Sequence, residues 1–82
     1  MRDMAADEGS GRQALAERIT VALVARAAGD LKRTQERTGL SKTDVVNRAL
    51  TLYEFVDSRL ASGDEIMLRH KESGEMELIR LL

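Results

Sequence analysis

The chain has 82 residues, which predicts one small domain whose single copy buries only a modest share of its surface. It contains no cysteine and one histidine, His70, so disulfides are excluded and no structural metal or cofactor is expected. The formal net charge is −1, which taken alone argues against a nucleic-acid partner. Oligomerisation is then the expected source of additional buried surface.

The charge is unevenly distributed along the chain. Residues 12–48 carry eight basic and four acidic side chains, a net charge of +4, whereas residues 1–11 and 49–82 carry −2 and −3. A basic centre is compatible with phosphate contacts, although it is weaker than in a strongly basic binder. No apolar run reaches membrane-spanning length and the start lacks the apolar core of a signal peptide, so a soluble, cytoplasmic protein is expected.

The first elements in chain order are an arm and a strand. Residues 1–16 are small and polar and predict a flexible N-terminal arm. The stretch "RITVALV" at 18–24 then alternates like a strand, with one side formed by Ile19, Val21 and Leu23 and the other by Arg18, Thr20 and Ala22. A lone strand leaves its backbone N–H and C=O groups unpaired, and the residues that follow favour helix. The residues that follow therefore offer this strand no partner.

Two helices are predicted next, separated by a glycine corner. Residues 25–38 form the first, which has a thin apolar stripe and ends at Gly39, a left-handed C-cap. Ser41 and Asp44 form a capping signature for the second, which ends at Gly63. Its apolar stripe comprises Val45, Ala49, Leu52, Val56 and Leu60, widened by Val46, Leu50 and Tyr53. This stripe is wider than the first helix alone can cover, which predicts contact with a second copy.

The last segment, residues 63–82, is predicted to form a C-terminal β-hairpin. Apolar residues alternate on both sides of "KESGE", where Gly74 supplies the turn. The four side chains expected to turn inward are Ile66, Leu68, Met76 and Leu78. A helical tail is the competing interpretation, because Glu, Met, Leu and Arg all favour helix.

The order of strand, helix, glycine corner and capped helix resembles the ribbon-helix-helix family of DNA-binding proteins (Arc/CopG/MetJ type). The resemblance covers residues 18–58, and its most specific parts are "RITVAL" at 18–23 and "TGLSKTDVVNRAL" at 38–50. It implies a mainly α fold with short β. It also implies a homodimer, in which the strand pairs antiparallel with the same strand of a second chain. Residues 17–62 would form this domain.

An intermolecular ribbon of this kind fits the major groove of DNA. The side chains left facing outward, and so expected to contact bases, are Arg18, Thr20 and Ala22. The resemblance assigns phosphate contacts to the start of the second helix, at Ser41, Lys42 and Thr43. The expected dimer core consists of Ile19, Val21, Leu23, Leu31, Val45, Val46, Ala49, Leu50, Leu52, Tyr53 and Val56. Two positions depart from the family pattern. At the position of Ala22 the family commonly has a long, polar residue, and at the position of Val24 it commonly has a residue that caps the first helix.

Three functions are compatible with this reading. The first is a homodimeric, sequence-specific DNA-binding transcriptional repressor or regulator that reads the major groove with strand 18–23. The second is the antitoxin of a toxin–antitoxin pair, which would bind a toxin through residues 63–82. The third is a dimerisation module that does not bind DNA. An enzyme built around His70 is not expected, because the sequence has no glycine elbow and no second histidine, and the chain is too short to form a substrate pocket.

Overall fold

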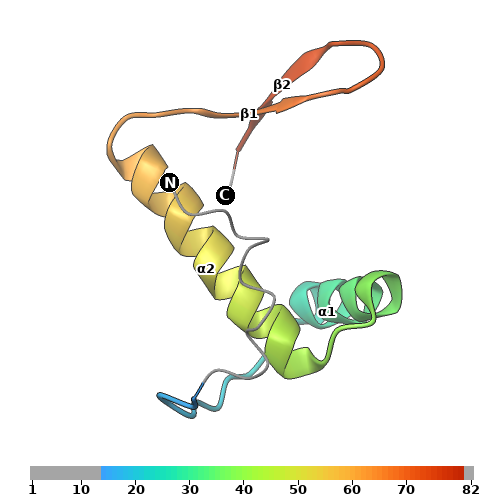
Figure 1. Cartoon of the computed structure of the whole chain (residues 1–82), viewed down its shortest axis with the longest axis vertical. Helices are drawn as coiled ribbons and strands as arrows, with labels where there is room; N and C mark the ends of the chain where they lie inside the picture. The colour runs from blue at the N-terminus through green and yellow to red at the C-terminus, as the bar shows by residue number, and fades with distance from the viewer. Residues whose placement is uncertain (1–13, 81–82) are drawn as a thin grey trace. The chain divides into compact units, whose positions relative to one another are not determined.

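The computed structural model describes residues 14–80, in which two helices are followed by one two-stranded antiparallel sheet. This is the predicted class, mainly α with short β (Figure 1). Most of the arm predicted over residues 1–16 lies outside the described residues. The chain divides into two units, Met1–Leu50 and Thr51–Leu82, which are considered separately below. Within the described residues, no helix is both long enough and apolar enough to cross a membrane.

The first unit begins with an irregular stretch and then the helix α1. Residues 14–24 are assigned neither helix nor strand, and α1 spans Ala25–Thr38, as predicted. Val24, in extended conformation, precedes the helix and provides no side-chain cap. Gly39 closes the helix in the left-handed conformation (φ 76°), and its N–H donates to the carbonyl of Gln35 at 2.8 Å. This is the single-bond type of left-handed helix cap.

The helix α2 spans Lys42–Ala61, and both of its ends agree with the prediction. Ser41 caps its start, and the carbonyl of Ser41 accepts the first helical bond from the N–H of Val45 at 3.0 Å. At the other end, the N–H of Gly63 donates to Leu60 at 3.0 Å and that of Asp64 to Arg59 at 2.9 Å. These two bonds, with Gly63 at φ 96°, form a Schellman motif that stops the helix.

The second unit carries the predicted hairpin. Strands β1 (Ile66–Arg69) and β2 (Met76–Ile79) pair antiparallel, so the helical alternative for this segment is wrong. The connecting turn is closed by the N–H of His70 donating to Glu75 at 2.7 Å and the N–H of Gly74 donating to His70 at 2.8 Å. Gly74 has φ 77°, a conformation that side chains other than glycine rarely adopt.

The inward-facing set predicted for the hairpin is wrong. Ile66 pairs with Ile79 and Met67 with Leu78, and residues directly opposite each other share a face of the sheet. Ile66 and Leu68 therefore lie on one face with Ile79, whereas Met76 and Leu78 lie on the other with Met67. Each strand alternates as expected, but the register between the strands joins odd-numbered to even-numbered positions.

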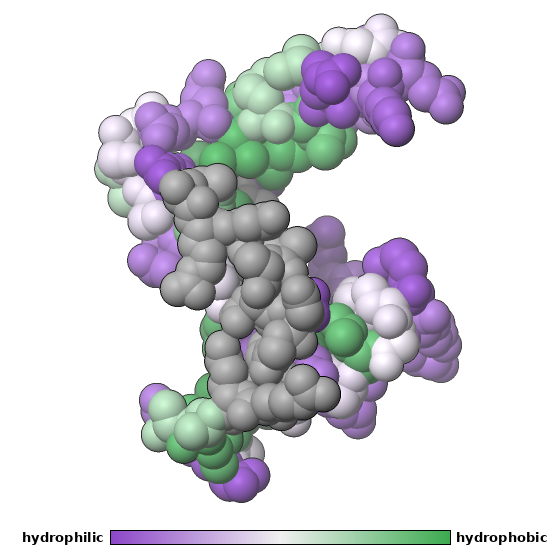
Figure 2. Space-filling view, in the orientation of Figure 1, coloured by the Kyte–Doolittle hydropathy of each residue, from purple (hydrophilic) through white to green (hydrophobic). Residues whose placement is uncertain are grey.

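No residue of the described part of the chain is buried. The best-covered apolar side chains are half-buried, among them Leu31, Val45 and Val46 in the first unit and Ile66 and Leu78 in the second. Figure 2 shows apolar side chains on the surface of the hairpin, with hydrophilic residues gathered at its turn. A single copy thus has two helices with defined ends and a hairpin, but its described residues form no buried core.

Candidate nucleic-acid interface

The segment that carries the predicted base contacts is open to solvent on both sides. Arg18, Thr20 and Ala22 are all exposed, as expected for an outward row. The other row is exposed too, with Ile19 and Val21 more than half accessible at 56% and 58%. Among the described residues no neighbouring strand pairs with this segment, so the backbone groups at its edges enter no strand ladder within one copy.

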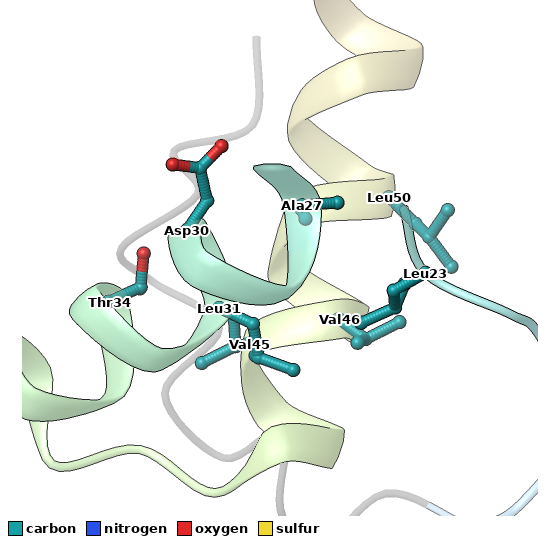
Figure 3. A pocket seen from close by; sticks show the side chains of 9 residues that line it. Leu23, Ala27, Asp30, Leu31, Thr34, Val45, Val46 and Leu50 are labelled. Carbon is teal, nitrogen blue, oxygen red and sulfur yellow. The ribbon is translucent and has the colours of Figure 1, made fainter. Parts of the chain in front are cut away.

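Leu23, at the end of this segment, faces an apolar hollow between α1 and the first half of α2 (Figure 3). Six of the eleven predicted dimer-core residues line the same hollow: Leu23, Leu31, Val45, Val46, Ala49 and Leu50. Ala27 completes its apolar wall, while Asp30 and Thr34 of α1 add polar atoms. The first unit therefore brings over half of the predicted core set together, and leaves it open.

The other predicted core residues do not line the hollow. Ile19 and Val21 are exposed in the preceding segment. Leu52 and Tyr53 are also exposed, farther along α2 at 50% and 58%, and Val56 is half-buried one turn later. On one copy these side chains remain exposed or only half-buried. Their apolar area is available to another chain.

Sequence reasoning missed Leu40. It lies between the cap of α1 and the cap of α2, and it is half-buried. Leu40 precedes the N-cap Ser41, and Val45 occupies the fourth helical position, which are the two positions of a hydrophobic staple. Its carbonyl also accepts a hydrogen bond from the Gln35 amide at 3.2 Å. The signal was present in the sequence as an apolar residue directly before the capping serine.

The predicted phosphate-binding residues meet at the start of α2. The Ser41 hydroxyl accepts the N–H of Asp44 at 3.1 Å, which leaves the N–H groups of Lys42 and Thr43 without an intrahelical acceptor. Both groups sit at the positive end of the helix dipole, and the exposed Lys42 adds a full charge. Such an arrangement favours an anion. The carboxylate of Asp44, in the same turn, opposes it.

The basic side chains of the described residues differ in whether a carboxylate pairs with them. Arg33 forms an ion pair with Asp30 at 2.6 Å, and the only other close contact between a basic or imidazole side chain and a carboxylate among residues 14–80 joins His70 to Glu77 at 3.1 Å. Arg18 and Lys42 therefore enter no ion pair within the described residues. They are the two predicted DNA contacts with a full positive charge, and both can accept a phosphate or a base as partner.

His70 lies beside an acidic side chain of the hairpin. Its Nε2 lies 3.1 Å from the carboxylate of Glu77, and both side chains are exposed. The hydroxyls of Ser41, Ser58 and Ser73 are hydrogen bonded to backbone groups instead. Among the residues that the structure describes, no three metal-ligating side chains gather.

Comparisons with known proteins add no family assignment. No protein-family model, curated protein or solved structure matches this chain.

Proposed function

We propose that this chain is a homodimeric ribbon-helix-helix DNA-binding protein that regulates transcription. The observation that carries the proposal is the segment 18–24. It alternates polar and apolar residues, lies exposed, and leads directly into two helices whose apolar side chains surround an open hollow. A second copy of the same segment supplies the missing strand and covers the apolar side chains.

The need for a dimer follows from the absence of a core. Ordering the backbone costs roughly 1–2 kcal/mol per residue, and burial of apolar area is the main term that offsets it. No described residue of one copy is buried, and Leu50 and Leu52 are each at least half accessible. One copy alone therefore lacks the burial that folding requires, and pairing of two copies provides it.

DNA is proposed as the partner because of the side chains that the ribbon would leave outside. Two copies of Arg18 and Thr20 would lie on one exposed surface, where Arg18 can donate two hydrogen bonds to guanine and Thr20 can bond to a base or contact a thymine methyl. Ala22 offers only an apolar contact. The N–H groups of Lys42 and Thr43 would hold phosphates and set the position of the ribbon.

The short side chain of Ala22 limits how much sequence one dimer can read. We therefore infer that recognition uses two or more dimers side by side on repeated half-sites. Phosphate contacts then supply a large share of the affinity, and base contacts at Arg18 supply the preference.

A gel-shift titration against DNA from the chain's own promoter region tests the proposal. Specific retardation that resists competition by random DNA is expected, with steps that correspond to successive dimers. Equal binding to promoter and random DNA would remove the sequence-specific regulator and favour the interaction module.

The antitoxin alternative receives less support. Toxin-binding tails are typically disordered when free. In this chain the corresponding segment has a defined register and a closed turn. A small toxin-like reading frame beside the gene would revive the alternative.

A further inference from the structure

Strand β1 lies in a stretch whose charges are arranged symmetrically about one residue. Residues 64–70 read "DEIMLRH", with Met67 at the centre and Ile66 and Leu68 on either side of it. Glu65 and Arg69 come next, and Asp64 and His70 form the outer pair. Reversing the direction of the stretch puts a basic or imidazole side chain where each acidic one stood, and an acidic side chain where each basic or imidazole one stood, while the three central positions stay apolar.

One edge of β1 is unpaired. In an antiparallel ladder, hydrogen-bonded and non-hydrogen-bonded pairs alternate. The N–H of His70 donates to Glu75, so the pair formed by these two residues is hydrogen bonded. The register then makes Met67–Leu78 and Arg69–Met76 non-hydrogen-bonded pairs. The backbone N–H and C=O groups of Met67 and Arg69 consequently point away from β2.

We propose that this edge binds the same edge of a second copy of the chain, antiparallel and about a twofold axis at Met67. In that register Glu65 lies opposite Arg69 of the second copy, and Asp64 lies opposite its His70. Ile66 lies opposite Leu68, and the two Met67 residues face each other. The symmetry repeats each contact, so the edge forms four opposite-charge or charge-capable pairs and a closed, isologous contact.

The outer edge of β2 lacks this complementarity. Its outward backbone groups belong to Met76 and Leu78, and a twofold axis midway between them sets two Glu77 carboxylates opposite each other. Like charges directly opposite are unfavourable. An axis at Leu78 instead sets Met76 opposite Arg80 and Glu77 opposite Ile79, which forms no ion pair. The β1 edge is thus the one that selects a second copy.

The hairpin also lacks several of the usual protections of an edge. Neither strand contains proline, lysine or a bulge, and the protections that remain are that each strand has only four residues and one charged side chain. Met67 and Leu68 are 45% and 47% accessible, and an isolated two-stranded hairpin is marginally stable in water. Pairing at β1 converts two such hairpins into one sheet of four strands. The contact requires neither the ribbon at residues 18–24 nor DNA.

Cysteine cross-linking of the full chain tests the contact, because the natural sequence has no cysteine. Directly opposed, hydrogen-bonded residues have Cα atoms about 5.5 Å apart, within the range of a disulfide. Met67→Cys should therefore oxidise to a symmetric disulfide-linked dimer at low micromolar concentration. Met76→Cys, on the other strand and similarly exposed, is the matched control and should cross-link at least roughly tenfold more slowly. Equal rates for the two variants would overturn the proposal.

Charge reversal in the Met67→Cys background tests the register. Arg69→Glu turns two opposite-charge pairs into two like-charge pairs and should slow cross-linking roughly tenfold. Adding Glu65→Arg should restore most of the rate, whereas Lys71→Glu, the same charge change in the turn, should have little effect. Circular dichroism of each variant checks that the chain still folds. Failure of the double reversal to restore the rate would contradict the register.

A variant that fails to fold is replaced by a milder one. Arg69→Gln removes the charge without introducing repulsion, and it should slow cross-linking less than Arg69→Glu does. If the neutral and reversed variants cross-link as fast as the parent, charge pairing at this edge is excluded. Ribbon pairing would be unaffected by that result, because Ile19 and Val21 lie outside the hairpin.

Discussion

The hydroxyl of Ser41 accepts a hydrogen bond from the backbone N–H of Asp44 at 3.1 Å. This one contact satisfies the third N–H of α2 and leaves those of Lys42 and Thr43 for another acceptor. The same serine therefore has a structural role in helix capping and defines the position at which an anion would bind.

Replacing Ser41 by alanine should destabilise the folded protein by about 1 kcal/mol, because one N–H at the start of α2 loses its acceptor. Urea denaturation at fixed protein concentration measures the change. Ser58→Ala is the control, since the Ser58 hydroxyl bonds only to the Phe55 carbonyl within α2 and alanine is a better helix former. Equal losses for both variants would show that the Ser41 cap contributes nothing specific.

The two glycines at α1 should respond to alanine in opposite directions. Gly39 has φ 76°, so Gly39→Ala should cost about 1–2 kcal/mol. Gly29 lies inside the helix, where alanine should add roughly 0.5–1 kcal/mol. The nearest side-chain atoms to the new methyl group would be those of the Arg33 guanidinium, at 3.3 Å, and this exposed side chain can move aside. Thermal melts of both variants test the difference in sign.

The helix boundaries could be predicted because local residues determine them. Ser41 with Asp44 marks the start of α2, and Gly39 and Gly63 mark the ends of α1 and α2 through conformations that glycine adopts readily. The hairpin turn at Gly74 could be predicted for the same reason. Each of these signals acts within a few residues of the position that it marks.

The face of the hairpin could not be predicted from alternation. The alternation of Ile66 with Met67 shows that β1 has two faces, but it does not show which residues of β2 share a face with each of them. The loop between His70 and Glu75 decides the register, and it pairs Ile66 with Ile79. The strand predicted at 18–24, which is irregular in one copy, has a different limit, because its expected partner belongs to another molecule.

The chain should be a dimer down to low micromolar concentration, and its melting temperature should rise with concentration. Leu52→Asp should unfold the protein, because the charge would enter the apolar stripe on α2. Ser58→Asp, on the opposite side of the same helix, should leave the dimer intact. Sedimentation and circular dichroism report the two effects separately. A well-folded monomer would contradict the dimer.

Amide hydrogen exchange should show that the N–H groups of alternate residues in the hairpin are protected. The N–H groups of Leu68, His70 and Glu77 point toward the neighbouring strand and should exchange slowly. Those of Met76 and Leu78 point outward and should exchange fast. Protection of Met67 and Arg69 as well would indicate that a second β1 covers the edge. No protection anywhere in 66–79 would contradict the hairpin and favour the antitoxin alternative.

The most direct test of the DNA-binding claim is a fluorescence anisotropy titration of promoter and random DNA with the parent chain, Arg18→Ala and Lys42→Ala, at several salt concentrations. If about four to six phosphates are neutralised, log affinity should fall with log salt at a slope of roughly −4 to −5. Arg18→Ala should lose about 1–3 kcal/mol on promoter DNA and little on random DNA. Lys42→Ala should weaken both and flatten the slope. Equal affinity of the parent for both DNAs, unchanged by Arg18→Ala, would contradict sequence readout by the ribbon.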